Sequence, residues 1–391
     1  MKQIASLILA SILLIGIEVQ AQEDYKDLHK KYEYTIEKKQ EVLAFDYDKI
    51  KFKKRPKNII LFIGDGMGVA QVFAGITVNE GLNIEQMPYI GFNKTQSADN
   101  YVTDSAAGGT AISTGVRTYN GAIGLDVNGQ KLTTILEYSE MNGKATGLVS
   151  TSAITHATPA SFIAHQPQRS MYEAIAGDFM NTDIDVFIGG GADFFTKRVD
   201  GRNLVLELNE KGYHVAYNVN DVQNVTDGKL AVLTAVGHNA GYRDRGEMLT
   251  KSTSKAIEVL NNADSKGFFL MVEGSQIDWG GHQNDASYVT GEVLDMDRAL
   301  GEALKFAAQD KRTLVIVTAD HETGGMSVND GNPAEGFVKA GFTTGDHSAV
   351  MVPVFAFGPG AEEFIGVYDN TDIFEKMYKL FKFKQENRLN K

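Results

Sequence analysis

The chain has 391 residues, enough for one large α/β domain or two ordinary ones. Its formal charge of −12, from 38 basic and 50 acidic residues, argues against a nucleic-acid-binding surface. It contains no cysteine, which excludes disulfides, thiolate metal sites and cysteine nucleophiles. Histidines and carboxylates would therefore have to hold any metal ion.

The first 21 residues have the pattern of a secretory signal peptide. Lys2 supplies the positive start, residues 4–17 are mostly apolar, and Val19-Gln20-Ala21 is a small-residue cleavage site. The apolar run is short for a membrane span, and the C-terminus is polar. We expect an exported protein, periplasmic or secreted, without a membrane anchor. Residues 22–56 are rich in Lys, Glu and Tyr, and we expect an N-terminal arm that lies over the surface.

A buried strand and the acid that follows it come next. Residues 59–63 are consecutive apolar residues, largely β-branched, which is typical of a strand buried on both faces. The strand ends at Asp65, which stands between Gly64 and Gly66. An acid at the carboxyl end of a central strand lies where open α/β sheets bind ligands. The alternative is an ordinary solvated turn residue.

Strands and helices then alternate to the end of the chain. The pattern predicts strands over residues 145–151, 185–188, 230–236, 268–273, 313–318 and 352–357, and helices over 131–142, 171–179, 249–261, 287–309 and 371–381. Such alternation predicts one large α/β domain over residues 57–391, with a mixed, mostly parallel central sheet covered by helices on both faces.

Acids and histidines gather at the ends of these strands or in the turns after them. They are Asp65, Glu273, Asp278, His282, Asp320, His321 and His347. So many buried acids would be costly without a counter-charge, which two divalent cations would supply. Imidazole and carboxylate ligands suit catalytic zinc, and carboxylates also suit magnesium. Each residue alone is more often structural than a ligand, so the prediction depends on the whole set.

A candidate nucleophile is Ser105, which is followed by a run of small residues. The run predicts a tightly packed helix that begins at the serine, and a helix N-terminus favours phosphate and an alkoxide. The alternative is that Asp104 or Ser105 is an ordinary N-cap. Arg169 follows the segment 155–160, and its guanidinium could bind a phosphoryl group through two parallel hydrogen bonds.

These motifs occur together in an order that resembles the alkaline phosphatase family. The resemblance extends over roughly residues 57–360. It includes Ile63–Gly68, Thr103–Ala107, His156–Ala160 with Arg169, Val272–Gly274, Ile277–Asp278, His282, Thr318–His321 and His347.

The resemblance implies a role for each matching residue. Ser105 resembles the nucleophile that becomes a phosphoserine intermediate, Arg169 the phosphate clamp, and Asp104 the residue that orients the clamp. The implied metal ligands are Asp278, His282 and His347 for a first Zn²⁺, Asp65, Asp320 and His321, joined by Ser105, for a second Zn²⁺, and Asp65, Thr158 and Glu273 for a third ion, usually Mg²⁺. The implied reaction is hydrolysis of small phosphate monoesters with release of inorganic phosphate.

Two positions vary within the resembled family. Some members have Asp and Lys where this chain has His156 and Trp279. His156 could hold the third metal directly or through water, which puts Mg²⁺ there in doubt. Trp279, at a substrate-binding position, lacks the positive charge of Lys, so we expect faster release of phosphate. The family resemblance usually implies a homodimer. The segment between His321 and His347 is too short for the extra surface domain that some members carry there, so a monomer is the alternative.

Other functions remain open from the sequence. The nearest is a phosphodiesterase of the same superfamily, which would not need Arg169 and the third site. A non-catalytic, metal-stabilised phosphate-binding protein would have no need of Ser105. A sulfatase is disfavoured because the context for formylglycine is missing. Four histidines match no site of the family and are interpreted as structural: His29, His165, His214 and His238.

Overall fold

The computed structural model describes residues 30–263 and 265–384, so the predicted signal peptide over residues 1–21 lies outside the described part. One ten-stranded sheet forms the centre of a single domain. Across the sheet, the strands lie in the order β15 (Gly366–Asp369), β3 (Tyr89–Lys94), β14 (Val352–Phe357), β9 (Thr313–Thr318), β2 (Asn58–Gly64), β8 (Phe268–Gly274), β4 (Ala145–Ala153), β5 (Val186–Gly190), β7 (Lys229–Leu233) and β6 (Tyr213–Ala216).

The sheet is mixed and mostly parallel, as predicted. Only β14 runs antiparallel to its neighbours, β3 and β9, and every other pairing is parallel. The central strands β2, β8 and β9 are buried along their whole length. Continuous apolar runs suit these positions, because both faces of a central parallel strand are covered.

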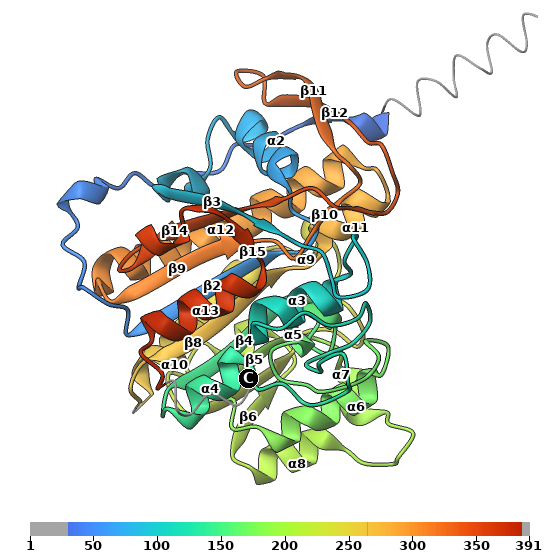
Figure 1. Ribbon diagram of the computed structural model, residues 1–391, viewed down its shortest axis with the longest axis vertical. Coiled ribbons are helices and arrows are strands. Elements are labelled where there is room, and N and C mark those ends of the chain that lie inside the picture. Colours follow the sequence, from blue (N-terminus) through green and yellow to red (C-terminus); the bar gives the residue numbers. More distant parts are fainter. Residues whose placement is uncertain (1–29, 264, 385–391) are drawn as a thin grey trace, which may run out of the picture.

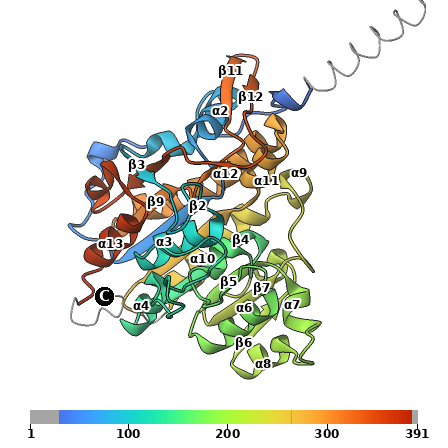
Figure 2. The ribbon, with the colours of Figure 1, turned by 45° about the vertical axis from the view of Figure 1, so that its right-hand side comes forward.

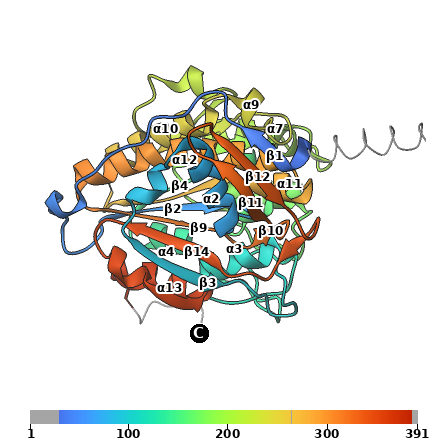
Figure 3. The same ribbon diagram turned by 90° about the horizontal axis from the view of Figure 1, so that it is seen from above.

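Helices cover both faces of the sheet. In Figure 3, α10 and α12 lie on one side of the sheet, and α4 and α13 lie on the other. A separate hydrophobic core fills each side. The helices are α2 (Val69–Asn79), α3 (Ser105–Thr114), α4 (Ile135–Met141), α5 (Ala157–Ala160), α6 (Tyr172–Asp178), α7 (Ala192–Thr196), α8 (Leu204–Glu210), α9 (Tyr242–Arg245), α10 (Met248–Asn262), α11 (Gln276–His282), α12 (Ala286–Asp310) and α13 (Thr371–Leu380).

A small sheet stands at one end of the molecule beside α2 (Figures 1 and 2). It joins β1 (Glu33–Thr35) to the hairpin of β11 (Ser327–Asn332) and β12 (Phe337–Gly341). From β1 the chain passes α12, where Gln40 Nε2 donates to Asp297 Oδ2 at 3.1 Å. It then reaches β14, where the rings of Tyr47 and Phe52 each lie 5.3 Å from the ring of Phe357.

The predicted elements agree with the structure, and several of their boundaries are shifted; for example, the strand predicted over residues 230–236 ends at Leu233. The helix predicted from residue 131 begins at Ile135, because Thr134 is its N-cap and Glu137 completes a capping box. The predicted strands at residues 268–273 and 313–318 match β8 and β9 to within a residue. Within residues 30–263 and 265–384, no helix combines the length and hydrophobicity needed to cross a membrane.

Candidate metal centre

The predicted site residues meet at one edge of the central sheet. Asp65 follows β2, Glu273 is near the end of β8, and Asp320 and His321 follow β9. Because these three strands are parallel neighbours, their carboxyl ends meet at the same edge. The remaining ligand candidates come from α11, which follows β8, and from the short strand β13 (His347–Ser348), which pairs with β10 (Glu322–Thr323).

The acids and histidines form three groups, and within each group the potential ligand atoms lie within 4.8 Å of one another. The groups are Asp278, His282 and His347; Asp65, Asp320 and His321; and Asp65, His156 and Glu273. The first two groups contain the acids and histidines that the family resemblance implies for the two zinc sites, and the third contains Asp65 and Glu273 together with His156.

Imidazole nitrogens face carboxylate oxygens in the first two groups. In the first, Nε2 of His282 and Nε2 of His347 lie 3.3 and 3.4 Å from Asp278 Oδ1. Asp278 and His282 are one turn apart on α11, so the helix places both side chains on one face. In the second, His321 Nε2 lies 3.3 Å from Asp65 Oδ1 and 3.5 Å from Asp320 Oδ2.

Several buried polar atoms at this edge lack a hydrogen-bond partner among the described residues. They are both carboxylate oxygens of Asp65, Asp320 Oδ2, Glu273 Oε1, Thr158 Oγ1 and His156 Nδ1. Buried polar atoms are normally paired, so a cluster of unpaired carboxylate and hydroxyl oxygens calls for a cation. Oxygen and imidazole donors without thiolates suit zinc and magnesium. The residues therefore fit divalent metal ions.

The electrostatics of the metal-free site lead to the same conclusion. Burial, together with the charges of Asp278 and Glu273, raises the pKa of Asp320 to about 7. Burial and the charges of Asp320, Asp278 and Glu273 also raise the pKa of Asp65. Burial lowers the pKa of His321. The hydrogen bond to Asp278 raises the pKa of His282 to about 9. Like charges therefore crowd the second and third groups, and bound cations would relieve this repulsion.

Ser105 begins α3 and lies against the second group. Its Oγ is 3.3 Å from His321 Nε2, and the residue is buried. Asp104 is the N-cap of α3, and its Oδ1 accepts a hydrogen bond from Ala107 N at 3.0 Å. The run of small residues explains how closely α3 approaches the backbone at Asp320, since a Cβ added at Gly108 would lie 3.0 Å from the backbone oxygen of Asp320.

Arg169 lies between Asp104 and His156. Its Nη1 donates to Asp104 Oδ2 at 3.1 Å, the contact through which Asp104 could orient the guanidinium. Asp104 is thus both an N-cap and a partner of Arg169. Nη2 of Arg169 lies 3.4 Å from His156 Nε2. Burial, followed by the charge of Arg169, lowers the pKa of His156 to about 3, so its imidazole is neutral.

The structure also brings in His238, which sequence reasoning left as structural. Its ring centroid lies 5.0 Å from that of Trp279 and 5.4 Å from that of His156. Its Nδ1 accepts a hydrogen bond from Ala153 N at 3.1 Å. A signal was present, because His238 comes soon after β7, the same placement that identified the other candidates.

His165 and His214, two other unassigned histidines, lie away from the three groups. His165 is held by Gly124 O at 2.9 Å and by Glu137 Oε1 at 3.0 Å, in agreement with a structural role. His214 lies on β6, at the far edge of the sheet. His29 is outside the described residues.

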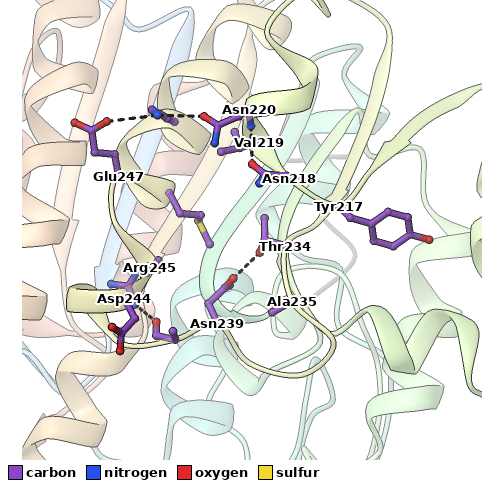
Figure 4. Close-up of a pocket in the computed structure, with 13 residues that line it drawn as sticks. Tyr217, Asn218, Val219, Asn220, Thr234, Ala235, Asn239, Asp244, Arg245 and Glu247 are labelled. Atoms are coloured by element: carbon purple, nitrogen blue, oxygen red, sulfur yellow. Dashed lines mark hydrogen bonds and ion pairs between the residues drawn. The ribbon is translucent and has the colours of Figure 1, made fainter.

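A pocket of about 390 Å³ opens beyond the ends of β6 and β7 (Figure 4). Its lining includes Tyr217, Asn220 and Asn239, and Thr234 Oγ1 donates to Asn239 Oδ1 across it at 2.7 Å. Within the described part of the chain, no candidate metal ligand lines this pocket. It is therefore a separate feature from the metal centre.

Comparisons with known proteins give one consistent result. The family model described as alkaline phosphatase matches residues 56–340. Alkaline phosphatase 4 of Bacillus subtilis (strain 168) is 35% identical over an alignment that covers 84% of this chain and 90% of the relative. Alkaline phosphatase of Escherichia coli (strain K12) is 33% identical, with coverage of 83% and 86%.

Similar solved structures also include alkaline phosphatases. The alkaline phosphatase from the Antarctic bacterium TAB5 has 43% sequence identity and a TM-score of 0.81, with coverage of 85% of this chain and 100% of that one. A variant of the TAB5 enzyme, in which a histidine is replaced by glutamate, has Mg bound in its M3 site; its identity is 42%, its TM-score 0.80, and coverage is 85% and 99%. The chain therefore belongs to the alkaline phosphatase family.

Proposed function

We propose that this protein hydrolyses phosphate monoesters through a phosphoserine intermediate at Ser105, with two Zn²⁺ and one Mg²⁺ in the three ligand groups. The observation that carries the proposal is the position of Ser105. A buried serine at a helix N-terminus, 3.3 Å from His321 Nε2 and beside unpaired carboxylates, is suited to a nucleophile and has no evident structural purpose.

Each ligand group would hold one ion. Asp278, His282 and His347 would hold the first Zn²⁺, and Asp65, Asp320 and His321 the second, next to Ser105. Divalent cations bound there would lower the pKa of the serine hydroxyl and neutralise charge on the attacking and leaving oxygens.

The residues of the chain supply binding and orientation. The N-terminus of α3 favours the phosphate anion through its free N–H groups and helix dipole. Arg169, held at Nη1 by Asp104, would bind two phosphoryl oxygens and stabilise the charge that spreads over them in the transition state. Together these groups would fix the phosphorus in line with Ser105 Oγ.

The reaction then has two displacements. Ser105 Oγ forms a bond to phosphorus while the bond from phosphorus to the leaving oxygen breaks, and the alcohol departs with the hydroxyl proton. Water then attacks the phosphoserine. The bond between phosphorus and Ser105 Oγ breaks, which restores the serine and releases inorganic phosphate.

The third group would hold Mg²⁺ mainly through oxygen atoms. Asp65, Thr158 and Glu273 offer unpaired oxygens there, and oxygen ligands suit magnesium. Arginine only donates hydrogen bonds, so its contact makes His156 Nε2 an acceptor and leaves the proton of this neutral imidazole on Nδ1. His156 would then act at this site as a hydrogen-bond donor and not as a direct ligand.

We further propose that the protein acts after export, in the periplasm or the medium. The support is the signal-peptide pattern of residues 1–21 in the sequence. The substrates would be small phosphate monoesters.

Hydrolysis of a phosphate monoester and a phosphate diester near pH 9, with zinc and magnesium and with a chelated control, tests the proposal. We expect fast monoester cleavage that the chelator abolishes and little diester cleavage. Preference for the diester would instead indicate a phosphodiesterase.

Ser105→Ala isolates the nucleophile. We expect it to lose turnover but still bind phosphate, whereas full turnover would refute the assignment of Ser105. Ser113→Ala is the matched control, because Ser113 is a buried serine of the same helix whose hydroxyl donates to Ser161 O, away from the metal centre.

A further inference from the structure

Thr323 lies between the first two ligand groups. It is fully buried and belongs to β10, directly opposite His347 of β13 in the antiparallel pair. Its backbone is held on both sides: its N–H donates to Gly66 O at 3.1 Å, and its carbonyl accepts from Gln71 Nε2 at 3.0 Å. The side chain thus emerges from a fixed backbone at the boundary between the two groups.

The hydroxyl of Thr323 contacts one candidate ligand from each group. It donates a short hydrogen bond to Asp278 Oδ1, and it lies 3.2 Å from His321 Nδ1. A hydroxyl has one proton, and an ionised carboxylate can only accept. The proton of the Thr323 hydroxyl is therefore directed at Asp278 Oδ1, which accepts it.

The tautomer of His321 follows from this arrangement. With its proton directed at Asp278, Thr323 Oγ1 can only accept from His321, so Nδ1 carries the imidazole proton. Nε2 then has a free lone pair, and Nε2 is the atom that faces Asp65, Asp320 and Ser105. A partner on the outer nitrogen is how proteins fix the orientation and tautomer of a metal-binding histidine.

The other two histidines of the centre are fixed by backbone carbonyls instead. His282 Nδ1 lies 2.8 Å from Gly345 O, and His347 Nδ1 lies 2.8 Å from Thr103 O. Among the three, only His321 has a side chain as its outer partner, so mutagenesis can test its role directly.

Two glycines make room for Thr323. A Cβ at Gly66 would lie 2.6 Å from Thr323 Oγ1, and a Cβ at Gly281 would lie 2.9 Å from Thr323 Cβ. Gly66 also has a φ of +73°, which an L-residue with a side chain rarely adopts. The turn after Asp65 and the helix that carries Asp278 are therefore both shaped around this threonine.

We propose that Thr323 is a positioning residue shared by the two zinc sites: its hydroxyl sets the tautomer of His321, orients Asp278, and holds the two ligand sets in one relative arrangement. The inference depends on the proposed two-zinc site.

Zinc affinity of the Thr323→Val variant is the direct test. Metal-free mature protein is titrated with Zn²⁺ in competition with a chromogenic chelator, which gives the dissociation constant of each site. Loss of such an outer partner typically weakens metal binding about 10- to 100-fold. We expect both constants of the valine variant to rise within that range. Thr323→Ser keeps the hydroxyl and should bind zinc like the wild type.

Thr313→Val is the matched control. Thr313 is also fully buried and its Oγ1 donates to Asp310 Oδ2 at 2.8 Å, but it begins β9, at the opposite end of that strand from Asp320. The Thr313→Val variant should have lower thermal stability than the wild type and the same zinc affinity. Circular dichroism of the metal-free variants checks that each is folded.

The outcomes separate the two proposals. Unchanged zinc constants in Thr323→Val overturn the positioning role, and weakening of only one site overturns the shared role. Failure of Thr323→Ser to restore binding would show that the methyl group, not the hydroxyl, matters. A wild-type protein that binds fewer than two zinc ions would refute the proposed function itself.

Discussion

Replacing Asp65 by asparagine should stabilise the metal-free protein, although it removes a candidate ligand shared by two groups. Asp65 is fully buried, and neither of its carboxylate oxygens has a hydrogen-bond partner among the described residues. The asparagine side chain would have nearly the same shape, no charge, and two N–H donors to offer the unpaired oxygens of Asp320 and Glu273. The variant should therefore relieve repulsion but bind metal poorly.

The size of the effect can be bounded in two ways. The ligand oxygens of Asp65 lie within 4.8 Å of those of Asp320 and Glu273, and at an effective dielectric constant of about 20 each pair repels by about 3.5 kcal/mol. Independently, the pKa of about 7 for Asp320 corresponds to a penalty of about 4 kcal/mol on its ionised form. The penalty derived from the pKa of Asp320 also includes the cost of burial, and proton uptake by the carboxyls limits the repulsion between the pairs. We expect a gain of about 2 kcal/mol at pH 8.

Thermal unfolding with chelator, and with zinc and magnesium, measures both effects. The chelated variant should melt higher than the chelated wild type by a few degrees, and added metal should raise its melting temperature far less. Asp297→Asn is the control: the oxygens of Asp297, another buried acid, accept from Asn83 N at 2.9 Å and Ile84 N at 3.0 Å. That variant loses a satisfied acceptor and should melt lower.

The same experiment has a pH signature. Folding raises the pKa of Asp65 and of Asp320, so these two carboxyls bind more protons in the folded state than in the unfolded state between about pH 4 and 7. Their contribution to the stability of the metal-free wild type should therefore fall as pH rises through this window, by up to about 1.4 kcal/mol per pH unit for each proton. The lowered pKa values of His156 and His321 contribute in the opposite direction in both proteins. Compared with the wild type, Asp65→Asn should therefore lose less stability as pH rises. A variant that melts lower than wild type in chelator, or keeps the full stabilisation by metal, would refute the reasoning.

Two further substitutions probe substrate binding. Trp279→Lys places a positive charge next to His156 and His238, whose rings Trp279 contacts. Phosphate should then inhibit the variant more tightly, and product release should slow. An unchanged inhibition constant for phosphate would refute this prediction. Asp104→Asn keeps an N-cap oxygen for α3 but loses the ion pair with Arg169; we expect kcat/KM for a monoester to fall about tenfold or more with little change in melting temperature. Unchanged kcat/KM would mean that other contacts orient Arg169.

The central sheet and most of the centre were predictable because their signals are local. Residues 268–273 and 313–318 are apolar runs long enough for buried strands, and an acid or histidine directly after such a strand can be placed at the sheet edge without further information. The helix at Ser105 was predictable from its small residues and its polar start.

What escaped prediction depends on contacts between distant segments. β3 contains Gly91 and ends with Asn93 and Lys94, so its apolar signal is weak, and pairing with β14 and β15 establishes it as a strand. Nothing in the local sequence distinguishes Thr323 from other threonines. The pairing of β10 with β13 and the turn at Gly66 place it beside Asp278 and His321. Hydroxyl residues are too common for their spacing to identify such a role.

The order of strands in the sheet has a consequence for biosynthesis. β2 pairs with β8 and β9, both of which leave the ribosome long after it. The apolar segment that becomes β2 therefore has neither of its neighbouring strands to pair with through most of translation. Chains that expose such a segment are prone to aggregate. Since His347 emerges later still, the nascent chain cannot complete its metal centre until most of the chain has been synthesised.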